Sequence, residues 1–132
     1  MARTLKRNAA SLVAEARRRI REIPAAEAVG MHGDPDVVFV DLRDPRERER
    51  SGFIPGSVHC PRGMLEFWVD PDSPYHKDVF DREEATYVFH CASGWRSALS
   101  VATLGTMGFE NAAHVTDGFS GWVEAGGPVE RS

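Results

Sequence analysis

A cysteine stands between a predicted strand and a predicted helix in the stretch HCASGWRSALS, residues 90–100. Small residues and Gly94 follow Cys91, and Arg96 comes before the main part of the helix. Backbone N–H groups at the start of a helix have no helical acceptor, and the helix dipole favours negative charge there. The loop amides and the Arg96 guanidinium should therefore stabilise a thiolate. We interpret Cys91 as a nucleophile.

The alternative interpretations of Cys91 are an inert buried thiol and a zinc ligand. Free cysteines are often buried, but a Gly-x-Arg loop between a strand and a helix argues against simple packing. Zinc would require two His-Cys pairs, at 59–60 and 90–91, and neighbouring strand residues point to opposite faces. Their separation also matches no usual zinc spacing. We expect no metal and no other cofactor, and we interpret His90 as a packed strand residue.

The hydrophobic pattern of the chain predicts alternating strands and helices. The run VVFVD, residues 37–41, is typical of a strand that is buried on both faces of a parallel sheet. Further strands are expected at 58–60, 85–90 and 112–116. Helices are expected at 5–21, 24–28, 62–68, 96–108 and 118–126, and a polar loop or helical turn at 43–52. This alternation predicts an α/β domain with a mainly parallel sheet.

Ligands of such sheets bind beyond the carboxyl ends of the strands. Four residues end predicted strands, and we expect them to share one edge: Asp41, Cys60, Cys91 and Thr116. A second thiol at this edge could resolve or relay chemistry begun at Cys91. We favour the simpler interpretation, in which Cys60 is a partly buried bystander.

The N-terminal residues form a basic, amphipathic extension. Apolar residues at 5, 9, 12, 13, 16 and 20 predict one helix over 5–21. Residues 1–22 hold seven Lys or Arg and two acidic residues, in a chain whose net charge is −4. Because the extension has no aromatic residue to stack on bases, we interpret it as a solvated face and expect no nucleic-acid partner. Its apolar stripe should pack on the body of a monomer or across a homodimer.

Length and composition limit the class of protein. The chain has 132 residues, the usual size of one domain. The longest apolar run near the N-terminus is Leu12–Ala14, shorter than a signal peptide requires, and no run approaches the roughly 20 residues of a membrane span. Two cysteines are too few for a disulfide scaffold. We expect a cytoplasmic protein with reduced thiols and no membrane partner.

Three segments resemble the rhodanese-like sulfurtransferases: VFVDLRDPRERERSGFIPGSVH, VFHCASGWRSALSVATLGTMGF and DGFSGWVEAGGPVE. The resemblance implies a three-layer domain at 23–132, with a mainly parallel five-stranded sheet flanked by helices. An additional amphipathic helix at 1–22 precedes it. The resemblance further implies that Cys91 carries a persulfide, formed from thiosulfate or another persulfide and passed to a thiol or cyanide. Expected partners are a small-molecule or protein persulfide donor and a thiol acceptor.

The resemblance also assigns the neighbours of the cysteine. The expected substrate-binding residues are Ala92, Ser93, Gly94, Trp95 and Arg96, together with Arg62, which is expected from its own position just after a strand end at the same edge. Asp41 and Arg43 match a strand-end Asp-x-Arg and are expected to support the loop. Asp41 is the candidate partner of Arg96, and Arg43 could meet Glu47. Trp95 could form a rim of the pocket or simply pack, and Arg62 could be either a second cation or a surface residue.

Two other functions remain as alternatives. Phosphatases and arsenate reductases on this fold are expected to use the longer spacing C-x5-R, whereas this chain has C-x4-R and places Ser97 where that arginine would stand. Non-enzymatic rhodanese-like interaction modules usually lack the cysteine. Ala92 replaces an arginine that many thiosulfate-using members carry, so thiosulfate is expected to be a weak donor. The donor and acceptor otherwise stay open among thiosulfate, mercaptopyruvate, glutathione persulfide and a desulfurase persulfide.

Overall fold

Five strands form a single, entirely parallel sheet. The computed structural model describes residues 2–132, so Met1 of the predicted N-terminal segment lies outside it. The strands are β1 (Arg21–Ile23), β2 (Val37–Asp41), β3 (Val58–His59), β4 (Thr86–His90) and β5 (Ala112–Val115). Their order across the sheet is β1-β5-β4-β2-β3. The predicted five-stranded α/β fold is confirmed.

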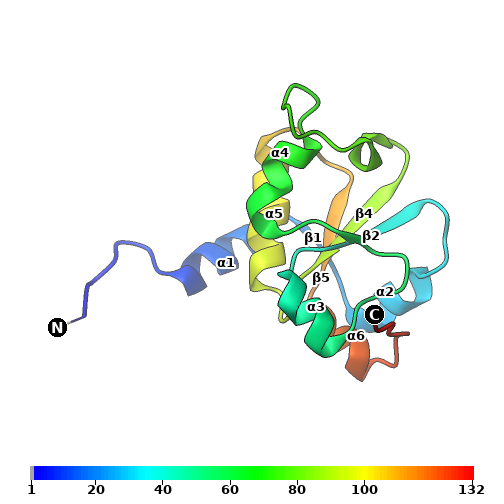
Figure 1. Ribbon diagram of the computed structural model, residues 1–132. Helices are drawn as coiled ribbons and strands as arrows, with labels where there is room; N and C mark the ends of the chain where they lie inside the picture. The colour runs from blue at the N-terminus through cyan, green and yellow to red at the C-terminus, as the bar shows by residue number, and fades with distance from the viewer. Residues whose placement is uncertain (1) are drawn as a thin grey trace.

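Helices cover both faces of this sheet (Figure 1). They are α1 (Ala9–Arg17), α2 (Ala25–Met31), α3 (Pro45–Ser51), α4 (Leu65–Val69), α5 (Trp95–Thr106) and α6 (Gly118–Glu124), with short 3₁₀ turns η1 (Arg62–Met64) and η2 (Asp78–Asp81). The core on one face involves α4 and α5, and the core on the other involves α2 and α6. No helix in residues 2–132 is long and apolar enough to span a membrane.

The central strands alternate their side chains between the two cores. Phe39 of β2 packs with Trp122 of α6, whereas Val40 belongs to the core that contains Leu104 of α5. In β4, Val88 and Phe89 divide in the same way. Burial on both faces explains why these strands are continuous apolar runs.

The predicted helix at 5–21 is too long. Helix α1 ends at Arg17, and Arg21–Ile23 instead form β1, which pairs with β5 and places Glu22 opposite His114. Ile23 is completely buried. A strand of three residues gains its hydrogen bonds from a distant partner, so local periodicity does not reveal it. The sheet consequently begins before the domain boundary expected at residue 23.

Helix α1 packs on α5 through only part of its apolar stripe. Val13 and Ala16 are buried with Ala98 of α5. Leu5 and Leu12 are 59% and 40% exposed. Residues 2–8, which precede α1, extend away from the body (Figure 1).

Candidate active site

Cys91 lies directly after β4, in the loop that enters α5. Its Sγ accepts hydrogen bonds from the backbone N–H of Gly94, at 3.1 Å, and of Ser97, at 3.4 Å. Cys91 is buried, with only 1% of its surface exposed. The loop and the first turn of α5 therefore direct N–H dipoles at the sulfur, where they stabilise negative charge.

Gly94 is required by the shape of this loop. Its φ of 107° lies in the left-handed region that favours glycine. A Cβ atom at this position would also lie 2.3 Å from the carbonyl oxygen of Thr116. Any side chain would push the loop away from β5 and turn the Gly94 N–H away from the sulfur.

The segment after β5 is hydrogen-bonded to the backbone of the cysteine loop. The carbonyl oxygens of Cys91 and Ala92 accept hydrogen bonds from the N–H groups of Phe119, at 2.7 Å, and Ser120, at 3.1 Å. Gly118 makes this approach possible, because a Cβ there would lie 2.6 Å from the Cys91 carbonyl oxygen. The sequence pattern did not reveal this contact, although the DGFSGW motif that makes it was part of the resemblance.

Arg96 pairs with Glu47 rather than with the expected Asp41. Nη1 and Nη2 each donate to one oxygen of the Glu47 carboxylate, both at 2.9 Å. The start of α3 fixes Glu47, because Asp44 and Glu47 form a capping box that includes an Asp44 N–H to Oε2 bond of 3.0 Å. Chiefly because Arg96 hydrogen-bonds to it, and despite partial burial, the pKa of Glu47 falls to about 2.

Asp41 is instead occupied by its own neighbours under the loop. Arg43 donates to it from Nε, at 2.9 Å, and from Nη2, at 2.7 Å, and Arg48 donates at 3.0 Å. Arg43 is also buried and packs its guanidinium 4.1 Å from the ring centre of Phe119. Asp41 thus supports the base of the site through Arg43, and Arg43 does not meet Glu47.

His90 is the least satisfied polar side chain beneath the loop. It is fully buried, and neither ring nitrogen has a hydrogen-bond partner in the described chain. Nε2 lies 3.5 Å from Asp41 Oδ2, and the ring stacks on Phe119. Burial disfavours the charged form of Asp41, but the nearby His90 and Arg43 outweigh it and hold its pKa well below the usual range.

Cys60 shares the strand-end edge with Cys91 but not its environment. Burial raises the pKa of the Cys60 thiol to about 12. Strand β2 lies between β3, which Cys60 follows, and β4, which Cys91 follows, because Asp41 pairs with both His59 and His90. The two cysteines are therefore separated by two strand spacings, or about 10 Å. A disulfide requires Cα atoms within about 7 Å. The structure therefore favours Cys60 as a bystander.

Two other predicted substrate-binding side chains face different surroundings. Arg62 pairs with Glu66, one helical turn later, at 2.8 Å, so its charge is already compensated. Trp95 is 48% exposed at the start of α5, which leaves its indole available to a ligand. Ala92 and Ser93 complete the loop and add no charge.

The His-Cys pairs considered as a zinc site have other roles. His59 Nε2 lies 2.6 Å from the carbonyl oxygen of Arg43, and Cys60 is packed in the core. The possible ligands that do come together within residues 2–132 are His76, Asp78 and Asp81, with ligand atoms within 4.8 Å of one another. They lie outside the cysteine loop.

This site and fold define the rhodanese-like class, and comparison with known proteins agrees. Residues 24–125 match the Rhodanese-like domain family, so the chain belongs to it. A thiosulfate:glutathione sulfurtransferase of Saccharomyces cerevisiae is 32% identical over 104 residues, which are 75% of this chain and 73% of that protein. A rhodanese domain-containing protein of Drosophila melanogaster is 26% identical over 97 residues, covering 70% of this chain and 87% of the fly protein.

Solved structures give the same fold. A protein of unknown function from Rhodopseudomonas palustris, described as a possible tyrosine phosphatase, has 48% identity and a TM-score of 0.94, with 98% of this chain and 99% of that chain covered. A rhodanese-related protein from Thermoplasma volcanium has 28% identity and a TM-score of 0.68, covering 85% of this chain and 99% of the other.

Proposed function

We propose that the protein is a sulfurtransferase that carries a sulfane sulfur as a persulfide on Cys91. The observation that carries this proposal is the pair of backbone N–H groups, from Gly94 and Ser97, directed at Sγ from the start of α5. They would stabilise the thiolate before reaction and the developing charge on sulfur during it. Membership of the rhodanese-like family supports the same chemistry.

The reaction has two displacement steps. The Cys91 thiolate attacks the sulfane sulfur of the donor and forms an S–S bond. The donor's bond to that sulfur breaks, and its electron pair leaves with the remainder of the donor. An acceptor thiolate or cyanide then attacks the outer sulfur, and the electron pair of the S–S bond returns to Cys91. Such a covalent intermediate predicts ping-pong kinetics.

The second candidate function is phosphatase activity, raised by the description of the Rhodopseudomonas palustris protein. Two features of the loop disfavour it. Only four residues separate Cys91 from Arg96, which makes a narrow ring of amides. The Arg96 guanidinium is also engaged by Glu47 through both Nη atoms, so these donors are not free for phosphate oxygens.

Donor, acceptor and compartment follow as parts of the same proposal. The yeast relative is named for thiosulfate and glutathione, which makes both of them substrates to test. A low-molecular-weight or protein persulfide should be a better donor than thiosulfate, because Arg96, the cation of the loop, is already paired with Glu47. The reaction needs a reduced thiol, which fits the cytoplasm. An interaction module without catalysis is the remaining alternative.

Mass spectrometry of the full chain after incubation with thiosulfate or glutathione persulfide tests the proposal. One added sulfur on the peptide that contains Cys91, and thiocyanate release on adding cyanide, are the expected results. Cys91→Ser should lose both, and Cys60→Ser should keep both. If the protein takes no sulfur from any donor but hydrolyses p-nitrophenyl phosphate, the result would refute sulfur transfer and support the phosphatase function. No reaction in either assay would favour the interaction module.

A further inference from the structure

A continuous line of polar side chains connects Cys91 to the surface. Cys91 Sγ lies 3.6 Å from Ser97 Oγ, and Ser97 Oγ lies 2.8 Å from His114 Nδ1. On the other side of the ring, His114 Nε2 lies 3.0 Å from Glu22 Oε2, and Arg17 Nε donates to the same oxygen at 2.7 Å. Ser97 and His114 are fully buried, whereas the Glu22 side chain is 32% exposed.

The sheet brings these residues together from distant parts of the chain. Glu22 of β1 and His114 of β5 are direct partners in the parallel ladder, so their side chains share one face. Ala112, two residues before His114, lies in the core that includes Leu104 of α5, so this face is the one that α5 covers. The first turn of α5 then places a serine between the histidine and the cysteine.

The hydrogen bonds of this line run in one direction. Burial opposes ionisation of Glu22, but hydrogen bonds from Arg17 and His114 outweigh it and lower its pKa, so the side chain is a carboxylate at neutral pH. A carboxylate only accepts, and His114 must therefore carry its hydrogen on Nε2. Burial, partly offset by Glu22, lowers the pKa of His114 and keeps the ring neutral, with a lone pair on Nδ1.

Ser97 completes the direction of the chain. Its hydroxyl donates to His114 Nδ1, since its other acceptor, the Gly94 carbonyl oxygen, is farther away at 3.4 Å. The serine oxygen then has a lone pair toward the cysteine, and the Cys91 S–H can donate to it. Every proton in the line points away from Cys91 and toward Glu22.

We propose that Ser97, His114 and Glu22 form a proton relay that takes the proton from Cys91. This inference rests on the proposed sulfur transfer. In the step, the S–H proton moves to Ser97 Oγ while the hydroxyl proton of Ser97 moves to His114 Nδ1. The products are a Cys91 thiolate and a His114 imidazolium, and no other reactant is needed. Ser97 contacts the reacting sulfur, and His114 and Glu22 act through it.

The charges around His114 allow the proton transfer only when the Cys91 thiolate forms at the same time. Glu22 from β1 favours the imidazolium, and Arg17 from α1 opposes it. A charge on the buried His114 ring would be unfavourable without a counter-ion. His114 therefore takes up the proton only as the Cys91 thiolate forms, because the thiolate is that counter-ion. Arg17 and Glu22 both precede residue 24, where the match to the rhodanese-like family begins. The N-terminal part of this chain therefore supplies the outer end of the relay.

The test is the rate at which iodoacetamide alkylates Cys91, measured by peptide mass spectrometry across the range from about pH 5 to pH 10. The variants are Ser97→Ala, His114→Asn, whose amide cannot take up a proton, and Glu22→Gln. Each should move the midpoint of the profile upward by about one pH unit, which lowers the rate about tenfold at pH values well below the midpoint. At the alkaline end, where water removes the proton, the rates should converge with that of the wild type.

Ser100→Ala is the matched control. Ser100 is equally buried on α5, but its hydroxyl donates to the Arg96 carbonyl oxygen, at 2.6 Å, and does not contact Cys91. Its midpoint should equal that of the wild type. Thermal melting verifies that each variant is folded, and Glu22→Gln, at the partly exposed end, decides the question if His114→Asn unfolds.

Two results would overturn the relay. One is a wild-type midpoint in all three variants. The other is a shift in Ser97→Ala alone, because the serine would then act only as a local hydrogen bond to sulfur. Alkylation needs no sulfur donor, so its result is independent of the proposed function. A shifted profile in a protein that forms no persulfide would support the relay and refute sulfur transfer.

Discussion

Arg96 and Glu47 join the cysteine loop to α3 through two parallel hydrogen bonds of 2.9 Å, across 49 residues of sequence. The side chain of Glu47 is 18% exposed and that of Arg96 is 41% exposed, so the pair closes the loop at the protein surface. Because the capping box of α3 fixes Glu47, the position of Arg96 depends on how that helix begins.

Breaking this pair should impair sulfur transfer more than it impairs folding. A lysine cannot reproduce the two parallel bonds of a guanidinium, so Arg96→Lys and Glu47→Gln should each lower kcat/KM for thiocyanate formation, by about tenfold for a displaced loop. Glu49→Gln, an exposed neighbour on α3, is the control and should match the wild type. Wild-type kcat/KM in both test variants would show that the pair is dispensable.

The same pair should make stability depend on pH in the acid range. The pKa of Glu47 is lowered in the folded protein, so its contribution is complete above its ordinary value near 4.5 and is lost as the pH falls toward 2. Solvent screening at the exposed guanidinium limits this contribution to about 1 kcal/mol. Urea unfolding should show Glu47→Gln less stable than the wild type at pH 7, with a difference that shrinks as the pH falls from about 4.5 toward 2. A difference that does not vary with pH would contradict the linkage.

Cys60 should be chemically silent. Burial raises the pKa of its thiol to about 12, so only Cys91 should react with iodoacetamide in the native protein between pH 7 and 9. Cys60→Ala should keep its sulfur-transfer rate and lose only about 1 kcal/mol of stability from the smaller side chain. A Cys60–Cys91 disulfide after mild oxidation, seen by peptide mapping, would reverse this assignment.

Thiosulfate should be a weak donor, with a KM well above that of a persulfide donor. Thiosulfate is a dianion, and of the two cations expected to bind it, Arg62 is paired with Glu66 and Arg96 with Glu47. An added charge in Ala92→Arg should lower the thiosulfate KM by about tenfold, because one charge-assisted hydrogen bond contributes roughly 1.5 kcal/mol. Ala92→Gln serves as the uncharged control. A low wild-type KM that the arginine leaves unchanged would contradict this prediction.

The stripe on α1 offers a matched pair of substitutions. Val13 is buried against α5, so Val13→Asp should cost about 2 kcal/mol and lower Tm by roughly 7 °C. Leu12 is exposed, so Leu12→Asp should leave the Tm of a monomer unchanged. If Leu12 instead packs across a homodimer, Leu12→Asp should convert the dimer to a monomer, and light scattering should show half the wild-type mass in solution. Equal Tm losses without a change in mass would contradict the packing of α1.

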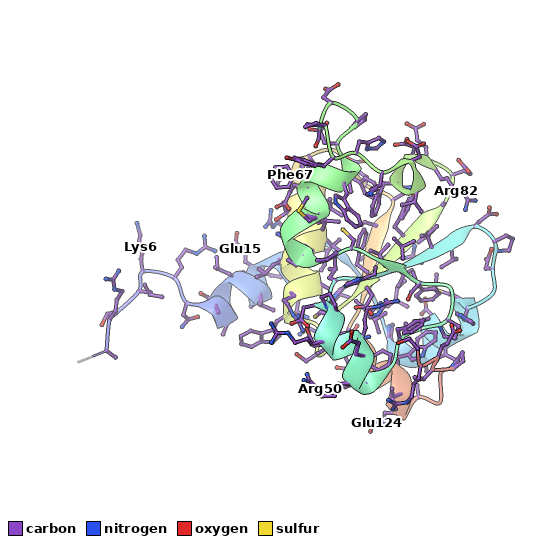
Figure 2. The ribbon with its side chains drawn as sticks, viewed as in Figure 1. Lys6, Glu15, Arg50, Phe67, Arg82 and Glu124 are labelled. Carbon is purple, nitrogen blue, oxygen red and sulfur yellow. The ribbon has the colours of Figure 1, made fainter. Side chains whose placement is uncertain are left out.

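Deletion of the N-terminal segment should be made short. Lys6 lies on the part that extends from the body, whereas Glu15 lies on α1 (Figure 2). Removing residues 2–6, which keeps Asn8 and its side-chain hydrogen bond from the Ser11 N–H at the start of α1, should therefore leave Tm and persulfide formation unchanged. A deletion through residue 21 would also remove Arg17 and the first residue of β1, and its effect could not be attributed to the helix alone.

The setting of Cys91, between a buried strand and the start of a helix, was predictable from local sequence. The strand before Cys91 is apolar because both of its faces are buried, and the helix after it has its own periodicity, so the cysteine had to fall between them. Gly94 was also predictable as a loop residue, since a turn of this kind favours positive φ. These features depend on residues close together in the chain.

The partners of those residues were decided by the tertiary structure. The sequence predicted Asp41 as the carboxylate that Arg96 meets. In the structure this carboxylate is Glu47, because α3 brings it to the loop and because Arg43 and Arg48 already occupy Asp41.

The sequence by itself determined an α/β domain, a cysteine at the carboxyl end of a strand and the tight loop that follows it, because each rests on a periodic or contiguous pattern. Only the tertiary structure decided that Arg21–Ile23 form an edge strand and that Ser97, His114 and Glu22 align behind Cys91. The physical reason is the strand order β1-β5-β4-β2-β3, which makes the first and last strands of the chain neighbours. Contacts between them depend on the packing of the whole sheet, which no local pattern records.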